Sequence, residues 1–353
     1  MKRIPELDAI RGLAVLGVVM FHCNSDTFSW GWSSVDLFFV LSGYLITTIV
    51  LADKERRGFL RSFYIRRISR IWPVYYLTLA AVVAMNAIFQ FGHPVNSIGW
   101  YLVFLQNTSQ YVGVPPAPFI VSFTPSWSVA VEEQFYLVWP LVLMAFGRSG
   151  AWIGAVLLLC LCVVGRFLMP TSIELLFTRG DGLAFGCLLA WFLQEDSESK
   201  PSKRTVYWLG ASAIVGGCYS ALYINEFWGN PHPNWTSTCY TGFSLFFFAL
   251  VGFCVRWSGV WWLRPLRVQP LRWVGTISYS LYLFHIPVFQ YSPIILGHIG
   301  IASPAVSELL QWLLVFALPT LSWYALERPI LRLTAQKRAP ETMASPVTKL
   351  QAA

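Results

Sequence analysis

Residues 33–52 read SSVDLFFVLSGYLITTIVLA, and residues 71–91 read IWPVYYLTLAAVVAMNAIFQF. Each run contains at most one charged residue and is long enough to cross a hydrocarbon core as an α-helix. Between them, residues 53–70 read DKERRGFLRSFYIRRISR and carry seven Lys or Arg residues. Two apolar helices joined by a strongly basic loop are typical of a polytopic membrane protein whose basic loops stay in the cytoplasm.

The composition of the whole chain agrees with this interpretation. Of its 353 residues, 56% are hydrophobic and 12% are charged, whereas about 25% of the residues in a soluble domain are charged. A formal net charge of +8 could suggest a nucleic-acid-binding protein. The basic residues lie mainly between the apolar runs, so we expect no nucleic-acid partner and assign them to membrane topology and to contacts with membrane lipid.

Apolar runs of spanning length recur along the whole chain, which predicts an all-α polytopic membrane helical bundle of about ten transmembrane helices. The predicted spans are residues 9–23, 33–52, 71–91, 127–147, 150–169, 172–193, 205–224, 240–256, 272–295 and 304–326. The first run imitates a signal peptide, but Glu6, Asp8 and Arg11 interrupt it and no small-residue cleavage site follows. We therefore expect this helix to be retained.

The placement of Lys and Arg orients these spans. Residues 53–70 and 256–272 are rich in both residue types, whereas the alternate segments have none: 24–32, 92–126, 225–238 and 296–303. Since basic loops stay in the cytoplasm, both termini are predicted to be cytoplasmic. We expect one membrane domain over residues 1–332 and a polar cytoplasmic tail over residues 333–353.

Arg11 and His22 share one face of the first helix. They are eleven residues apart, which is almost three full turns and places them roughly 16 Å apart along the axis. Charge inside a membrane is costly, so a functional role is one interpretation for Arg11, as it is for Arg166 and Arg179, which also lie in or at the edge of predicted spans. The alternative is an Arg that extends to the lipid headgroups and an interfacial His bonded to a backbone carbonyl.

Three carboxylates are predicted near the outer level of His22. Asp36 begins the second helix, and Glu132 and Glu133 begin the fourth. Asp36 could orient the imidazole of His22, or it could simply stabilise a helix N-terminus. Adjacent helical residues differ by about 100°, so at most one of the two glutamates points squarely into the bundle. Ser42 and Gly43 are expected to permit close helix packing.

Arg67 and Arg70 lie one helical turn apart at the cytoplasmic start of the third helix. Such a pair could bind phosphate groups, although anchoring to anionic lipid is an alternative. Arg179 and Asp181 are two residues apart and cannot face each other, so each needs a partner on another helix or a polar cavity. His285 is interpreted as a hydrogen-bonding residue between helices.

Nucleotide-binding and metal-dependent chemistry are not expected, because their sequence motifs are absent. The sequence contains no P-loop, no G-x-G-x-x-G and no H-E-x-x-H motif. No Cys and His cluster has the spacing of metal ligands, so we expect no metal.

Six motifs together resemble the acyltransferase 3 family of membrane O-acyltransferases. They are LDAIRGLA at 7–14 followed by His22, VDLFFVLSG at 35–43, RISRIWP at 67–73, WSVAVEEQFY at 127–136, SYSLYLFHIP at 278–287 and ERP at 327–329. The resemblance runs from residue 5 to about 332 and implies ten transmembrane helices, a cytoplasmic acyl-CoA donor and an acceptor hydroxyl, usually on a sugar. It also implies essential roles for Arg11 and His22. We expect a location in a bacterial inner membrane and, because the chain leaves no room for the extra soluble domain that some members carry, a stand-alone membrane domain.

Acyl transfer to an alcohol needs a base, a site for the developing oxyanion and precise placement of the thioester. We assign His22 as the base, with Asp36 or one of Glu132 and Glu133 as its orienting group. Arg67 and Arg70 are predicted to hold the phosphates of acyl-CoA, with acetyl-CoA expected, and Arg11 to contact the pantetheine path or a phosphate.

The acceptor is expected to be a carbohydrate or another hydroxyl compound. Segment 225–238 combines Trp228 and Trp235 with amide and carboxylate side chains, which suits a sugar. Segment 92–126 is the second candidate, and an ordinary interfacial aromatic belt is the alternative. A glycan exporter or flippase without acyl-transfer chemistry is the competing function, but it predicts internal repeats or broken helices, which the sequence does not show. The oligomeric state stays open.

Overall fold

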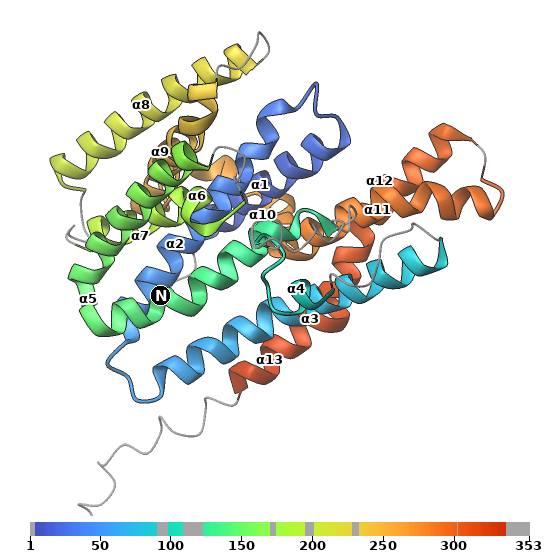
Figure 1. Cartoon of the computed structure of the whole chain (residues 1–353), viewed down its shortest axis with the longest axis horizontal. Coiled ribbons are helices and arrows are strands. Elements are labelled where there is room, and N and C mark those ends of the chain that lie inside the picture. The colour runs from blue at the N-terminus through green and yellow to red at the C-terminus, as the bar shows by residue number, and fades with distance from the viewer. Residues whose placement is uncertain are drawn as a thin grey trace, which may run out of the picture.

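The computed structural model describes residues 4–89, 98–108, 123–169, 174–194, 201–227, 233–301 and 303–336. All regular structure in these ranges is helical, which confirms the all-α prediction (Figure 1). The elements are α1 (Pro5–Cys23), η1 (Ser29–Ser33), α2 (Ser34–Asp53), α3 (Phe59–Ile88), α4 (Ile98–Leu102), α5 (Ser126–Leu168), α6 (Leu176–Arg179), α7 (Asp181–Leu193), α8 (Lys203–Phe227), α9 (Pro233–Arg256), η5 (Trp261–Arg267), α10 (Gln269–Thr276), α11 (Ser278–His298), α12 (Pro304–Ser322), η6 (Trp323–Glu327) and α13 (Arg328–Gln336).

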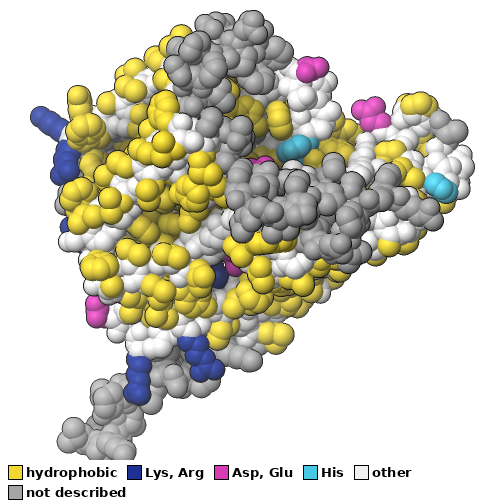
Figure 2. Space-filling model, viewed as in Figure 1, with side chains coloured by type: hydrophobic (Ala, Val, Ile, Leu, Met, Phe, Trp, Pro, Cys, Tyr) yellow, Lys and Arg dark blue, Asp and Glu magenta, His cyan; other side chains and the backbone are white. Residues whose placement is uncertain are grey.

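The described part of each of the ten segments predicted from apolar runs contains helix. Five described stretches are long and apolar enough to cross a membrane: Ser29–Asp53, Phe59–Ile88, Ser126–Leu168, Thr238–Arg256 and Pro304–Thr334. The total of ten spans therefore stays a prediction. Large hydrophobic side chains such as Phe146, Leu168 and Ile214 are exposed. Figure 2 shows hydrophobic side chains over much of one face, with most Lys and Arg at its margins. A surface of this kind fits a lipid environment.

Several predicted boundaries differ from the structure, and the predicted spans 172–193 and 272–295 are each divided between two helices, α6 and α7 in the first and α10 and α11 in the second. α3 begins at Phe59, so most of the predicted basic loop 53–70 is helical, and only a short turn ending at Gly58 joins α2 to α3. Gly58 has a φ of 72°, a left-handed conformation that glycine adopts without strain. The predicted spans 127–147 and 150–169 form one element, α5, in which Gly147 alone leaves helical geometry. α13 continues to Gln336, past the predicted start of the tail.

α2 and α7 touch through their backbones. A Cβ atom at Gly43 would lie 2.1 Å from the carbonyl oxygen of Leu183, and one at Gly186 would lie 2.2 Å from that of Val40. Any larger residue would force the two helices apart, because real Cβ contacts are never this short. The prediction that Gly43 permits close packing is therefore confirmed. This contact fixes the register between α2 and the segment around Arg179.

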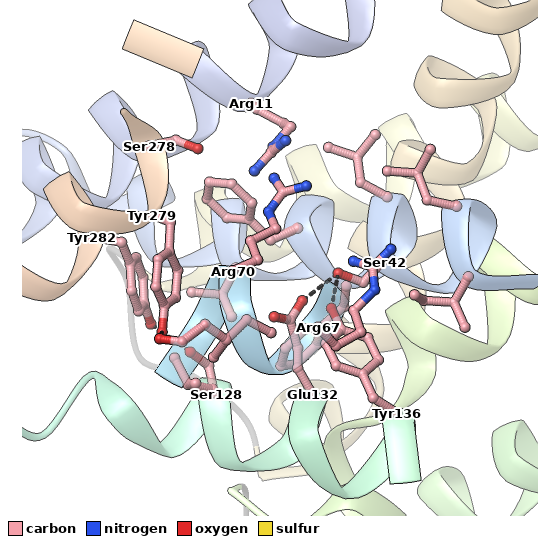
Figure 3. A pocket seen from close by; sticks show the side chains of 18 residues that line it. Arg11, Ser42, Arg67, Arg70, Ser128, Glu132, Tyr136, Ser278, Tyr279 and Tyr282 are labelled. Carbon is pink, nitrogen blue, oxygen red and sulfur yellow. Dashed lines mark hydrogen bonds between the residues drawn. The ribbon is translucent and has the colours of Figure 1, made fainter. Parts of the chain in front are cut away.

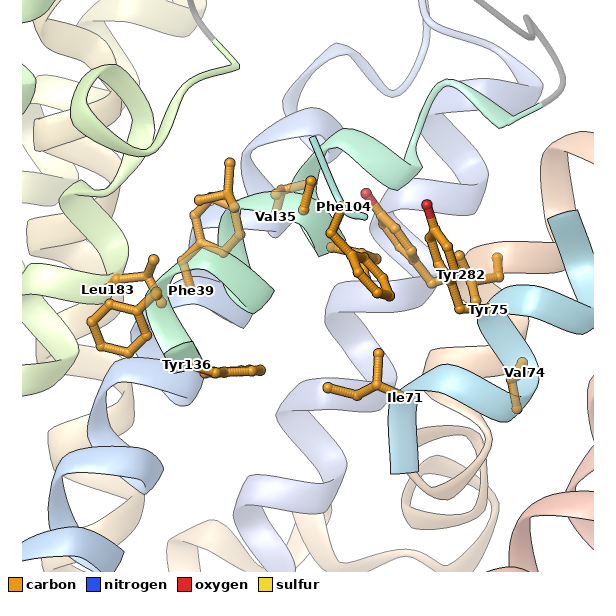
Figure 4. Close-up of a cluster of buried hydrophobic side chains, with 14 of the residues drawn as sticks. Val35, Phe39, Ile71, Val74, Tyr75, Phe104, Tyr136, Leu183 and Tyr282 are labelled. Carbon is orange, nitrogen blue, oxygen red and sulfur yellow. The ribbon is translucent and has the colours of Figure 1, made fainter. Parts of the chain in front are cut away.

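The main hydrophobic core lies where α2, α3, α5, α7 and α11 meet (Figure 4). Aromatic rings dominate it on one side, and the rings of Tyr75 and Phe104 have centroids 4.4 Å apart. Phe39 of α2 and Leu183 of α7 continue the core on the other side. Two cavities with polar lining residues, described below, interrupt this core.

Candidate active site

One cavity, here called the arginine cavity, lies between α1, α2, α3, α5 and α11 and has a volume of about 90 Å³ (Figure 3). Arg11, Arg67 and Arg70 line it together with a single carboxylate, that of Glu132. The sequence prediction that the three arginines act together is consistent with this arrangement. Three guanidinium groups that face one carboxylate leave an excess of positive charge, which favours phosphate groups.

A hydrogen-bonded chain of side chains orders the carboxylate in this cavity. Tyr136 donates to Ser42 Oγ over 2.9 Å, and Ser42 in turn donates to Glu132 Oε1 (Figure 3). The Arg67 guanidinium carbon lies 5.6 Å from the ring centroids of both Phe63 and Tyr136. Such cation–π contacts hold a guanidinium in place without using its N–H donors. Ser42, which the sequence assigned to packing, is thus part of the cavity.

Glu133 faces away from the arginine cavity. Its Oε2 accepts a hydrogen bond from Trp72 Nε1 over 3.0 Å. Only one of the two adjacent glutamates therefore lines the cavity, in agreement with the predicted 100° offset. The predicted role of Glu132 or Glu133 in orienting His22 is not seen, because neither residue lines the cavity that contains His22.

His22 lines a second cavity of about 250 Å³, here called the histidine cavity. Its walls come from segments that lie far apart in the chain, and they combine aromatic rings with one carboxylate and one guanidinium. The lining residues are Val18, Phe21, His22, Trp32, Val35, Thr124, Pro125, Trp127, Glu174, Arg179, Tyr240 and Tyr282. Arg11 and His22, which the sequence placed on one face of α1, therefore line two different cavities.

The partner of His22 is a second histidine. His22 Nδ1 lies 2.9 Å from the carbonyl oxygen of Val18 and 3.2 Å from His285 Nε2. Because a carbonyl oxygen can only accept, we assign the hydrogen to Nδ1, which leaves a free lone pair on Nε2 of neutral His22. His285 is fully buried. Its predicted role as a hydrogen-bonding residue between helices is confirmed, since it joins α11 to α1.

The predicted role of Asp36 in orienting His22 is not seen in this structure either. Asp36 instead forms an ion pair with Arg179, and the two side chains are 0% and 3% exposed. A carboxylate without access to water needs a counter-charge, and a guanidinium supplies one better than a neutral imidazole. The guanidinium carbon of Arg179 also lies 3.8 Å from the ring centroid of Tyr240. Asp36 thus positions Arg179 in the wall of the histidine cavity.

A second buried ion pair, between Arg166 and Asp181, lines neither cavity. Arg166 binds Asp181 through two hydrogen bonds of 2.6 and 3.0 Å, and Thr241 donates to the same carboxylate over 2.7 Å. The prediction that Arg179 and Asp181 need partners on other helices is therefore confirmed for both. The sequence marked Arg166 as an intramembrane charge but did not identify Asp181 as its partner.

Part of the predicted acceptor site lies outside the described residues. This applies to Trp228 and to most of segment 92–126, and the side chain of Trp235 is not described either. Among the described side chains, no three His, Cys, Asp or Glu residues come together in a metal-binding group.

Comparison with known proteins identifies relatives over almost the whole chain. A family model of an acyltransferase domain matches residues 4–328. The chain is 30% identical over 370 residues to the peptidoglycan O-acetyltransferase OatA of Listeria monocytogenes, covering 93% of this chain and 56% of the relative. It is 31% identical over 358 residues to the putative peptidoglycan O-acetyltransferase YrhL of Bacillus subtilis, covering 93% and 55%.

The O-acetyltransferase OatA of Staphylococcus aureus is 29% identical over 352 residues, which cover 93% of this chain and 57% of the relative. The chain thus spans little more than half the length of these relatives. No solved structure matches it. The family match covers both cavities and every residue assigned to them. The chain therefore belongs to the acyltransferase 3 family.

Proposed function

We propose that this chain is a membrane O-acetyltransferase that moves an acetyl group from acetyl-CoA to a hydroxyl group of a cell-wall glycan. One observation carries the proposal: a cavity with three arginines adjoins a cavity with a histidine base, and Val35 and Tyr282 line both. The relatives named as peptidoglycan O-acetyltransferases support the acetyl group and the glycan acceptor.

The membrane topology completes the proposal. The chain would cross a bacterial plasma membrane ten times with both termini in the cytoplasm, and residues 1–332 would form the membrane domain ahead of a short polar tail. The distribution of Lys and Arg supports this arrangement. The arginine cavity would then open towards the cytoplasm, since Arg67 and Arg70 follow the basic turn before α3. The histidine cavity would face the outer side.

The arginine cavity would hold the donor. Arg67 and Arg70 are placed to bind the phosphate groups of acetyl-CoA, and Arg11 lies on the opposite wall, on α1 (Figure 3). Glu132 limits the positive charge and, through Ser42 and Tyr136, fixes the shape of the wall. A small cavity suits the narrow pantetheine arm, whose length would carry the thioester towards His22.

His22 would act as the general base. Its Nε2 would take the proton of the acceptor hydroxyl while that oxygen bonds to the acyl carbon and the carbon–sulfur bond breaks. The proton would then pass to the departing thiolate, so that CoA leaves as a thiol. During this step Nδ1 keeps its hydrogen, and Val18 and His285 both lie within hydrogen-bonding distance of it. An acyl-histidine intermediate is compatible with the same geometry.

The histidine cavity would hold the acceptor. Trp32, Trp127 and Tyr240 offer aromatic faces, and Glu174 and Arg179 offer hydrogen-bonding groups. A sugar has apolar C–H faces and many hydroxyl groups, so it can use both kinds of wall. This cavity supports an acceptor site in addition to segment 225–238, with Trp228 and Trp235, that the sequence suggested.

The proposal is tested with the purified full chain in lipid vesicles, radiolabelled acetyl-CoA and an uncrosslinked peptidoglycan strand. We expect acceptor-dependent release of CoA and a base-labile acetyl ester on the glycan. If the glycan is instead moved across the vesicle membrane without any ester being formed, the exporter function is correct and acyl transfer is rejected.

A further inference from the structure

Two side chains separate the arginine cavity from the histidine cavity. Among the described residues, Val35 of α2 and Tyr282 of α11 are the two that line both. Each is only 7% exposed. A group that is bound in one cavity and reacts in the other must therefore reach past these two side chains. We call the part of the combined site between Val35 and Tyr282 the neck.

The ring of Tyr282 is held firmly in this neck. Its hydroxyl lies 2.7 Å from Ser128 Oγ and donates to the carbonyl oxygen of Pro125 over 3.0 Å. Both partners belong to the start of α5, whose first residue follows Pro125. The ring also packs against Phe38 and His285, with centroid distances of 6.3 and 5.9 Å. Moving the ring aside would break both hydrogen bonds in a buried setting, which is costly.

We propose that Val35 and Tyr282 set the size of the acyl group that the enzyme transfers, and that they restrict it to acetyl. This inference rests on the proposed function, because it needs a donor bound at the arginines and a base at His22. With the phosphates held at Arg67 and Arg70, the thioester carbon meets the acceptor hydroxyl at the neck. Additional methylene groups would then collide with a valine and a fixed aromatic ring, and packed interiors tolerate such overpacking poorly.

The test compares transfer from acetyl-CoA, propionyl-CoA and butyryl-CoA by the purified full chain with one glycan acceptor. One methylene in an apolar pocket changes kcat/KM by about 10- to 200-fold, so we expect the wild type to prefer acetyl over butyryl by at least about 100-fold. Val35→Ala and Tyr282→Leu widen the neck and should each reduce this preference by about tenfold or more.

Two control variants change a valine and a tyrosine elsewhere in the chain. Val50→Ala removes the same atoms from a fully buried position on α2 that lines neither cavity. Tyr76→Phe removes a hydroxyl that donates to the carbonyl oxygen of Leu102 over 2.8 Å, also outside both cavities. Both controls should keep the acyl preference of the wild type.

The outcomes separate this inference from the proposed function. If the wild type transfers no acyl group, the proposed function fails. If the wild type transfers acetyl but Val35→Ala and Tyr282→Leu keep its acyl preference within twofold, the neck does not select the acyl group and the inference is wrong. An equal shift in Val50→Ala would also overturn it. Should Tyr282→Leu fail to fold, the pair Val35→Ala and Val50→Ala decides alone.

Discussion

Replacing His285 tests whether the second histidine positions the first. His285 is fully buried, and its Nε2 lies 3.2 Å from His22 Nδ1. His285→Leu removes this partner and fills the space with an apolar side chain. The contact between His22 and the carbonyl oxygen of Val18 remains. We therefore expect a protein that folds and inserts into the membrane, but in which His22 is held less well once its imidazole carries a positive charge.

The size of the effect follows from the contact that is lost. A hydrogen bond to a charged group contributes about 1.5–3 kcal/mol, and about 1.4 kcal/mol of barrier corresponds to a tenfold change in rate. Because His22 becomes charged only as it takes the hydroxyl proton, the loss falls on the transition state. We expect kcat to fall by about 10- to 150-fold, with the KM for acetyl-CoA unchanged, since His285 does not line the arginine cavity.

The assay is steady-state release of CoA at saturating acceptor, with membrane insertion checked for each variant. His285→Gln is the matched variant, because its amide oxygen can accept a hydrogen bond, and it should recover most of the lost rate. A His285→Leu enzyme with the kcat of the wild type would refute the positioning role. So would a variant in which the KM for acetyl-CoA rises while kcat stays the same.

Three other predictions concern the remaining contacts. Arg67→Ala or Arg70→Ala should raise the KM for acetyl-CoA by about tenfold or more, whereas the exposed Arg61→Ala should not; an unchanged donor KM would place the phosphates elsewhere. Trp127→Ala should raise the KM for the glycan and leave hydrolysis of acetyl-CoA without acceptor unaffected. If the acceptor kinetics are unaltered, Trp127 is not part of the acceptor site. Asp181→Ala should destabilise the fold by about 3–5 kcal/mol because it removes the carboxylate that neutralises the buried guanidinium of Arg166; a melting temperature equal to that of the wild type would contradict this.

The helices were predictable from the sequence because hydrophobicity is a local property. Long apolar runs predicted ten segments in whose described parts the structure has helix. Arg11, Arg166 and Arg179 were unusual because each places a charge inside such a run or at its edge. The boundaries were less predictable. α3 begins at Phe59, well inside the basic segment that separates two predicted spans, since helix propagation does not stop at charged residues.

The partners of the site residues were not predictable, because they depend on how distant helices pack. Asp36 had a nearby candidate in His22, but the close contact at Gly43 and Gly186 brings α7 and its neighbour Arg179 to α2. His285 lies on α11, and nothing in its local sequence indicates that it meets His22 on α1. The separation into two cavities also depends on Tyr282, a side chain that the sequence gave no reason to select among the tyrosines of α11.

His22 is the residue on which the proposed acyl transfer depends, because it is assigned as the base. The most direct measurement is the acceptor-dependent turnover of acetyl-CoA by His22→Ala, purified as the full chain and shown to insert into the membrane as the wild type does. Loss of a general base lowers the rate by about 100-fold or more, so we expect turnover at or below about one hundredth of the wild-type value. A variant that keeps even about a tenth of the wild-type turnover would contradict it.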